Sequence, residues 1–126
     1  KLCLQTFIPM LATMTVNRNN MRNAAAKGFI NATDCADYLV KKGMAFRDAY
    51  KITGTLVALC IEKGTVLEKL PIADYKALSE LFDEDIYTAI SLDTCVNQRK
   101  SFGAPAAECV KEQLSLVRQK LEGNNG

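Results

Sequence analysis

The side chains that could perform chemistry in this chain of 126 residues are carboxylates, lysines, arginines, serines and five cysteines. Histidine is absent, which excludes a Ser-His-Asp or Cys-His nucleophile system and any histidine metal ligand. Closely spaced cysteine pairs of the kind that form structural zinc sites are absent as well. No carboxylate, serine or lysine is paired by its spacing with a base or an orienting group. We therefore assign no catalytic, cofactor-binding or metal-ligating residue from the sequence.

Three groups of charged residues are candidate binding sites. The acidic residues 83–85 lack the ligand spacing of a calcium loop and fit the start of a helix, where the helix dipole favours carboxylates. Residues 98–100 place arginine and lysine in a loop-like stretch, which is weak evidence for an anion site. Arg18, Arg22 and Lys27 have no interleaved aromatic residues, so a solvated face is favoured over nucleic-acid binding.

The composition is that of one soluble globular domain. Hydrophobic residues make up 48% and charged residues 24%, and the formal net charge of +2 is spread along the chain, which predicts neither nucleic acid nor membrane as a partner. No apolar run approaches the length of a membrane span and no signal-peptide pattern is present, so we expect a cytoplasmic protein. The odd number and wide spacing of the cysteines predict reduced core residues: Cys3, Cys35, Cys60, Cys95 and Cys109.

Residues 31–64 are predicted to fold as two helices joined by a tight glycine turn, and the second helix is the most apolar long segment. Gly43 and Gly64 would supply the left-handed residue after each helix. Asn31 or Thr33 would cap the start of the first helix. Two adjacent apolar strips on the second helix predict that it packs between several neighbours. The strips are Phe46, Tyr50, Thr53, Val57 and Cys60, and Ala49, Ile52, Leu56 and Leu59.

A third strip of the second helix is charged at its ends and small in the middle. Glycine inside a helix costs about 1 kcal/mol relative to alanine, so Gly54 suggests a place where another backbone could approach closely. The strip contains Arg47, Lys51, Gly54, Thr55, Ala58 and Glu62.

The first part of the chain predicts two helical segments. Residues 1–18 carry an apolar stripe with no preceding cap, as the end of a longer helix would, and Pro9 predicts a kink or a restart within it. Residues 17–28 combine asparagine-rich turn signals with an alanine run and a closing glycine, which predicts a break and one short helix. The apolar stripe of the first segment contains Leu4, Phe7, Ile8, Leu11, Met14 and Thr15, and Met21, Ala24 and Ala25 are expected to face inward in the second segment.

The last part of the chain predicts short helices and a final longer one. After a connector at residues 65–70, Pro71 fits the first turn of a short helix. Residues 91–104 are loop-like, and Thr94 could cap a single turn there. Pro105 would begin the final helix. Its predicted apolar stripe contains Ala106, Val110, Leu114, Val117 and Leu121.

The chain is predicted to be all-α, because no segment alternates with a period of two over enough residues to form a strand. We divide it into the end of a truncated helix (residues 1–18), a helical domain (residues 19–122) and a disordered tail (residues 123–126).

The sequence resembles the C-terminal region of argininosuccinate lyase, in the fumarase/aspartase superfamily. The resemblance covers roughly residues 22–121 and is carried by ATDCADYLVKKGMAFRDAYKITGTLVALCIEKG, LFDEDIYTAI and CVNQRKSFGAPA. The chain departs from the family pattern at Ala45, where proline is frequent, at Tyr50, where histidine is frequent, and at FGAP, where paired glycines are frequent. These departures leave open the roles of Tyr50 and of residues 101–105.

The resemblance implies a C–N lyase as the parent protein, which would cleave argininosuccinate into fumarate and arginine by β-elimination, a step of arginine biosynthesis. The family's catalytic motifs, including a serine-bearing flexible loop, lie in regions that this chain lacks, so we expect the chain alone to be inactive and to need no cofactor. Its expected partners are the remainder of the lyase chain and the other subunits of a homotetramer. Residues 1–18 would belong to a shared central helix bundle and could mediate self-association.

Two other interpretations remain open from the sequence. Helical folds of this kind host many functions, so a stand-alone helical protein-interaction module is the main alternative. A helix-turn-helix nucleic-acid binder is disfavoured by the dispersed charge.

Overall fold

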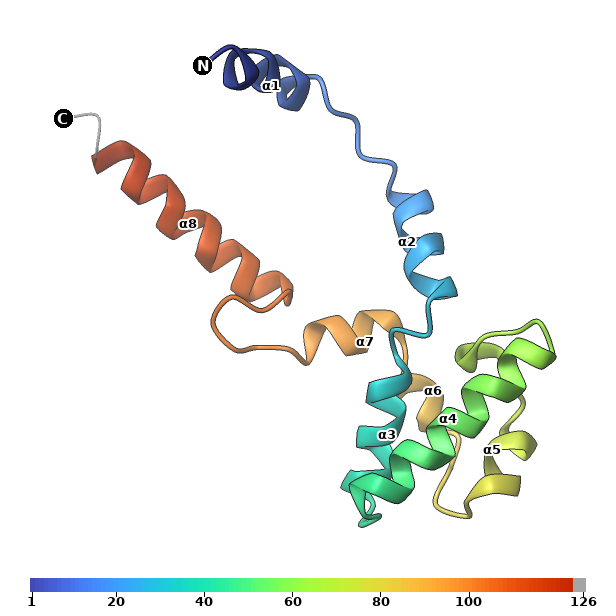
Figure 1. Cartoon of the computed structure of the whole chain (residues 1–126). Helices are drawn as coiled ribbons and strands as arrows, with labels where there is room; N and C mark the ends of the chain where they lie inside the picture. Colours follow the sequence, from blue (N-terminus) through green and yellow to red (C-terminus); the bar gives the residue numbers. More distant parts are fainter. Residues whose placement is uncertain (124–126) are drawn as a thin grey trace.

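The computed structural model describes residues 1–123, and every regular element within that range is a helix (Figure 1). No strand occurs between residues 1 and 123, which confirms the predicted all-α fold. None of the helices in this range is both long and apolar enough to cross a membrane. The elements are α1 (Leu2–Ala12), α2 (Arg18–Lys27), α3 (Ala32–Lys41), α4 (Phe46–Glu62), the 3-10 helix η1 (Leu67–Lys69), α5 (Ile72–Leu78), α6 (Ile86–Ala89), α7 (Leu92–Asn97) and α8 (Ala107–Gly123).

The main hydrophobic core lies between α3, α4 and the short helices that follow them. Helices α3 and α4 form a hairpin, and η1, α5 and α6 close around it (Figure 1). The ring of Tyr75 lies edge-on to Phe82, with 5.0 Å between the ring centroids, and Tyr38 stacks on Phe82 at 5.8 Å. The largest fully buried side chains are Tyr75, Phe82, Leu39, Leu56, Leu67, Leu70, Ile86, Ile90, Cys35 and Cys60.

The predicted glycine turns are confirmed. Gly43 follows α3 with a φ of +97°, and Gly64 follows α4 with a φ of +61°. Both values lie in the left-handed region, which glycine adopts without the steric cost that other residues meet. The chain can therefore reverse directly after α3 and again after α4, and the two turns fix the length of each helix.

Helix α4 buries one face and exposes the other, which corrects the prediction that it packs between several helices. The buried residues Ala49, Thr53, Leu56 and Cys60 are taken alternately from the two predicted apolar strips. Phe46 and Tyr50, which belong to one of those strips, are 57% and 69% exposed. The buried face therefore runs along the boundary between the strips, and the outer part of the aromatic strip has no neighbour within the described residues.

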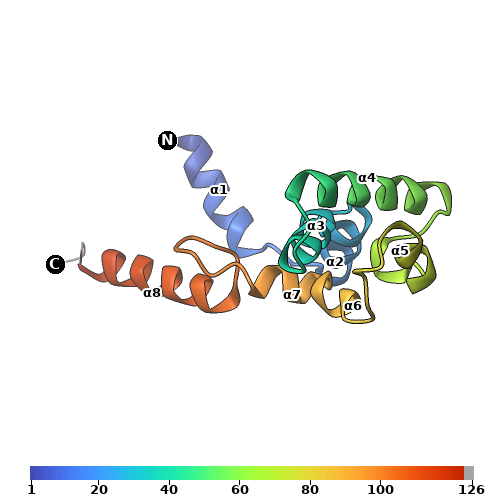
Figure 2. The same cartoon turned by 90° about the horizontal axis from the view of Figure 1, so that it is seen from below.

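Two arms extend from this body on the same side of the molecule (Figures 1 and 2). Neither α1 nor α2 contains a buried residue, and α8 buries only Cys109. The inward orientation predicted for Met21 and Ala24 is therefore wrong, and Ala25 is only half-buried, whereas the apolar stripe of α1 lacks a partner within the described chain. Met21 is 64% exposed and Phe7 is 52% exposed. The sequence periodicity predicted which side of each helix is apolar, but those apolar sides have no partner within the described chain.

Several predicted boundaries shift by a few residues. Helix α1 ends at Ala12 and continues through Pro9. Helix α7 is capped by Ser91, whose hydroxyl accepts a hydrogen bond from the Thr94 N–H at 3.2 Å, so the predicted cap at Thr94 is wrong. Helix α8 begins two residues after Pro105, because the carbonyl of Ala106 accepts the first helical bond from the Val110 N–H.

The end of the chain also differs from the prediction. Gly123, which we assigned to a disordered tail, is the last residue of α8. The rest of the predicted tail, residues 124–126, lies outside the described residues.

We expect Gly54→Ala to stabilise the protein by about 0.5–1 kcal/mol. Gly54 lies within α4, and a Cβ atom built there meets nothing within 4 Å, so the helix propensity of alanine is gained without a clash. Urea unfolding measures the difference. Gly43→Ala is the matched control, because its positive φ should make the same substitution destabilising by about 1–2 kcal/mol. A destabilising effect of Gly54→Ala would contradict the open space around Gly54.

Candidate functional site

The acidic residues after α5 form an ion-pair cluster with the C-terminal end of α3. The ammonium of Lys42 lies 2.8 Å from the Asp83 carboxylate and 3.6 Å from that of Asp85, and it sits 4.6 Å from the centre of the Tyr38 ring. The Tyr38 hydroxyl donates a hydrogen bond to Asp85 and accepts one from the Asp83 N–H at 3.2 Å. The hydrogen bond between Asp83 and Lys42 lowers the pKa of Asp83 and raises the pKa of Lys42.

This cluster joins α3 to the start of α6 and leaves its carboxylates engaged. Asp85 also occupies the N-terminal position of α6, as the sequence predicted for this acidic triplet. Within residues 1–123, no group of three or more histidine, cysteine, aspartate or glutamate side chains could hold a metal ion. The cluster ties the end of α3 to the start of α6 through ion pairs and hydrogen bonds.

The cations of residues 98–100 are held by acidic partners. Arg99 lies 3.0 Å from the carboxylate of Asp34 near the start of α3, and it also donates to the Cys95 carbonyl. Lys100 lies 3.0 Å from Glu108 in the first turn of α8. In both contacts a carboxylate neutralises the positive charge that would attract a bound anion. The structure places these residues at the junction of α3, α7 and α8 and gives them a positioning role there.

The basic residues of α2 show a similar arrangement at one position. Arg22 makes a two-pronged contact with Asp93 in α7, with distances of 3.1 and 2.8 Å between the guanidinium nitrogens and the carboxylate oxygens. This contact lowers the pKa of Asp93. It is exposed, so we expect it to contribute little to stability. The expectation that the chain binds neither nucleic acid nor membrane stays a prediction.

The short helices are held in place by side chains that bond to backbone carbonyls. The buried Asn31 donates its amide N–H to the carbonyl of Ile90 at 2.9 Å, linking the start of α3 to the end of α6. Tyr75 donates to the carbonyl of Leu67 at 2.8 Å. Tyr87 donates to the carbonyl of Leu70 at 2.6 Å.

These bonds were not predicted from the sequence. Asn31 does occupy the capping position of α3, but its side chain makes no capping bond. The partner of each side chain is a backbone carbonyl outside its own helix, and the residue type that carries this carbonyl gives no signal of the bond.

We expect Asn31→Ala to destabilise the protein by about 1–3 kcal/mol, because the substitution leaves the Ile90 carbonyl without its donor inside the core. Urea unfolding of the variant provides the measurement. Asn23→Ala, at an exposed position of α2, is the control and should change stability by no more than about 0.5 kcal/mol. Equal effects of the two substitutions would show that the Asn31 bond contributes nothing specific.

The cysteines divide into one exposed and four buried thiols. Cys35, Cys60, Cys95 and Cys109 are buried and free, as predicted, whereas Cys3 is exposed on α1, which corrects its assignment to the core. Burial raises the pKa of Cys35 to about 11, and the neighbouring Thr53 side chain opposes this shift. Burial also raises the pKa of Cys95 to about 12. Because the thiolate is the nucleophile, these groups are suited to packing and not to catalysis.

We expect Ellman's reagent at pH 8 to react rapidly with one thiol of the folded protein. Cys3 is accessible, while the other four are shielded and two of them have strongly raised pKa values. Cys3→Ser should remove the rapid phase, and all five thiols should react in denaturant. A rapid phase of more than one equivalent would show that the core opens readily.

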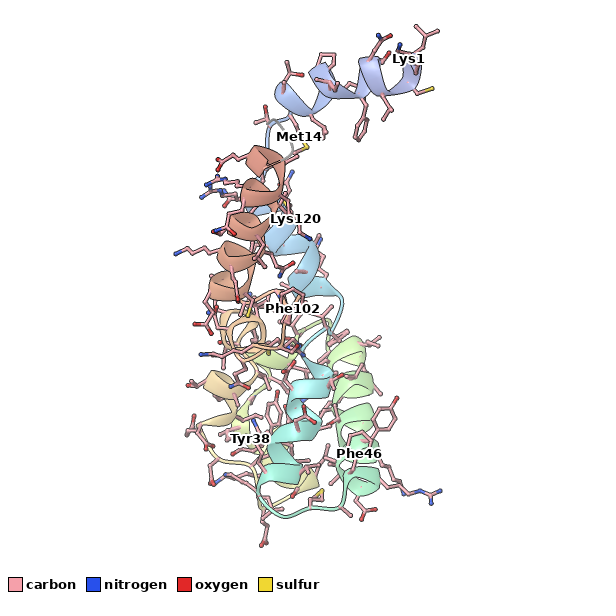
Figure 3. The ribbon with its side chains drawn as sticks, turned by 90° about the vertical axis from the view of Figure 1, so that its left-hand side faces the viewer. Lys1, Met14, Tyr38, Phe46, Phe102 and Lys120 are labelled. Carbon is pink, nitrogen blue, oxygen red and sulfur yellow. The ribbon has the colours of Figure 1, made fainter. Side chains whose placement is uncertain are left out.

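The surface of α4 next to α3 contains a shallow apolar hollow of about 290 Å³. It includes Tyr50, whose role the sequence left open, and it contains no carboxylate, lysine or arginine. Figure 3 labels Phe46 at the start of α4, and its ring lies 6.1 Å from that of Tyr50. The hollow is lined by Ala32, Thr33, Tyr50, Thr53, Gly54 and Val57.

The loop at residues 101–105 forms an exposed turn before α8. Gly103 adopts a φ of +83°, and the neighbouring Phe102 is 81% exposed (Figure 3). Neither the hollow nor this turn places an acid, a base and a nucleophile together.

These observations describe a helical domain in which ion pairs and hydrogen bonds join the helices to one another and several apolar faces are exposed. The chain belongs to the family described as "Argininosuccinate lyase C-terminal", whose family model matches residues 29–97.

Argininosuccinate lyases from several bacteria are similar to almost the whole chain. The lyase of Clostridium botulinum (strain Eklund 17B) is 50% identical over 125 residues, which are 99% of this chain and 27% of that protein. The lyase of Desulforamulus reducens is 48% identical over 120 residues, 95% of this chain and 26% of that protein. The lyase of Lachnospira eligens is 48% identical over 122 residues. The chain spans about a quarter of the length of the curated relatives it matches.

The matched range coincides with the packed body of the structure. Residues 29–97 begin just before α3 and end with α7, and they contain the whole main core. Helices α1, α2 and α8 lie outside this range. The family pattern therefore corresponds to the part of the chain that buries its own side chains.

Proposed function

We propose that this chain serves as a structural domain of an argininosuccinate lyase. The parent enzyme would cleave argininosuccinate into fumarate and arginine by β-elimination. In that reaction a base removes a proton next to a carboxylate, the carbanion is stabilised electrostatically, and an acid assists the departure of the guanidino group. The chain would supply a scaffold and cap for the catalytic regions, and it would contribute none of these three groups itself.

One observation carries this proposal. The family match covers the body formed by α3 to α7, in which the polar contacts described above join one helix to the next. A scaffold needs such internal contacts and needs no reactive group. The proposal includes a cytoplasmic location, which the free state of all five cysteines supports, since reducing conditions keep thiols unpaired.

The proposed partners are the remainder of the lyase chain and the other subunits of a homotetramer. Helix α1 supports this part of the proposal, because Leu4, Phe7, Ile8, Leu11 and Met14 are each more than half exposed. Burying a large apolar side chain contributes about 1.5–3 kcal/mol, so a complex in which a partner covers this stripe would be strongly stabilised. In the isolated chain the same stripe would mediate self-association.

We expect the purified chain to release no fumarate from argininosuccinate above a buffer blank, because the base and acid of the proposed reaction lie outside it. Fumarate is measured by its ultraviolet absorbance. The complete lyase of Desulforamulus reducens, assayed at the same molar concentration, is the positive control. Turnover by the chain itself, in a preparation free of host enzyme, would contradict the scaffold role.

We also expect the chain to self-associate through α1. Sedimentation at micromolar concentrations should show a species larger than a monomer, and Phe7→Ser combined with Leu11→Ser should shift it toward the monomer. Leu2→Ser is the control, because it removes an exposed apolar side chain on the opposite side of the helix from this stripe. A wild-type monomer, or an oligomer unchanged by the double substitution, would rule out association through this face.

A further inference from the structure

The N-terminal arm, formed by α1 and α2, joins the body through a bend at residues 28–31 (Figure 1). No residue of α2 is buried, and only Ala25 and Ala26, near its end, are half-buried. Among the hydrogen bonds and ion pairs formed within residues 1–123, the contact between Arg22 and Asp93 is the only one that joins α2 to another helix. The position of α2 on the body therefore depends on a small apolar contact and on one ion pair.

The bend contains a residue in a strained backbone conformation. Phe29 has a φ of +49°, and it is the only residue other than glycine with a positive φ in the described part of the chain. A bulky residue meets steric resistance in the left-handed region, and it stays there only where the surrounding structure holds it. The ring of Phe29 packs against the main core, which holds the body side of the bend. The arm side is held by Arg22, which lies earlier in the sequence on α2.

The ion pair of Arg22 and Asp93 has a geometry that restricts direction as well as distance. Two guanidinium nitrogens meet separate carboxylate oxygens, at 3.1 and 2.8 Å, and such a two-pronged contact orients its partners more strictly than a single hydrogen bond does. Asp93 follows Leu92, whose N–H donates to the carboxylate of Glu68 in η1 at 3.2 Å. Asp93, and after it Glu68, raise the pKa of Arg22. The arm is therefore attracted to carboxylates of the body that α7 and η1 supply.

This ion pair can open while the body stays folded. The side chains of Arg22 and Asp93 are 61% and 69% exposed, so water and ions reach both of them. An exposed pair adds little to the free energy of unfolding, and salt screens it. The main core contains no residue of α2, so the core does not change when the pair breaks.

We propose that the Arg22–Asp93 ion pair is a releasable clamp that holds the N-terminal arm in one direction, and that Phe29 is the hinge at which the arm turns when the pair opens. Ionic strength controls the clamp: at low salt α2 is held against α7, and at high salt it samples several directions. Because α1 precedes α2 in the chain, the clamp also limits where the apolar stripe of α1 lies relative to the body. This inference does not depend on the lyase activity proposed for the parent protein.

The test measures the distance between two spin labels on the full 126-residue chain by double electron–electron resonance. Asn19→Cys carries a label on α2 and Lys51→Cys carries one on α4, and both positions are exposed. Cys3→Ser removes the accessible native thiol, while the four buried thiols are shielded from the labelling reagent. An excess of unlabelled chain removes distances between copies. At low salt we expect one narrow distribution of distances.

Charge reversals separate the ion pair from the other contacts of α2. Arg22→Glu and Asp93→Arg should each roughly double the width of the distribution at low salt, because like charges then face each other. The two substitutions together should restore the narrow distribution, since the pair re-forms with its charges exchanged. Arg18→Glu is the matched control and should leave the distribution unchanged, because Arg18 lies on the same helix and forms no ion pair within the described residues.

A second pair of labels locates the hinge. Ile30→Cys, used in place of Asn19→Cys, puts the label on the body side of Phe29 at an exposed position. With this label the distribution should stay narrow in every variant and at every salt concentration. Broadening at Ile30 would place the motion inside the body and would overturn the hinge at Phe29.

Salt provides the last measurement. At about 1 M salt the Debye length falls to about 3 Å, so the distribution from the Asn19 label should become as broad as that of Arg22→Glu. A narrow distribution that survives Arg22→Glu would show that Ala25 and Ala26 hold the arm, and it would overturn the clamp. The same conclusion would follow from a broad distribution in the chain with its native ion pair at low salt, or from a double reversal that does not restore the narrow one.

Discussion

Packing of α3 against α4 is the constraint on which the rest of the body depends. Helices α5, α6 and α7 contain only seven, four and six residues, and helices of such length are not stable alone. Helices α5 and α6 persist because Tyr75 and Ile86 enter the core that the α3–α4 hairpin opens, and α7 buries Leu92 and Cys95 next to them. The hydrogen bonds from Asn31, Tyr75 and Tyr87 to distant carbonyls then fix their positions. The hairpin provides the apolar surface, and these polar side chains determine the orientation of the short helices on it.

The hairpin was predictable from the sequence because its signals are local. Gly43 and Gly64 mark turns that need a left-handed residue, and the apolar spacing of α4 extends over four turns. The contacts of Asn31 and Arg99 were not predictable, since each joins segments more than fifty residues apart. The exposure of Phe46 and Tyr50 was missed for a different reason. Periodicity reports that a face is apolar, but it does not report whether a partner covers that face.

The charged groups of the candidate sites show the same distinction between local pattern and folded contact. The absence of histidine excluded several kinds of catalysis at once. In the structure, Asp83 of the acidic triplet pairs with Lys42 at the end of α3. The basic loop pairs with Asp34 on α3 and with Glu108 on α8. The pairing of Lys42 with Asp83 and of Arg99 with Asp34 required the folded arrangement.

Separation of the arms from the core has a consequence for how this sequence can change over time. Because α1 and α8 contribute no side chain to the main core, substitutions on their exposed faces leave the stability of the body nearly untouched. Selection can therefore adjust those faces for a partner without being limited by folding. The body, in contrast, can accept few replacements at its buried positions. The chain thus combines one segment whose evolution is limited by packing with two arms whose exposed faces are free of that limit.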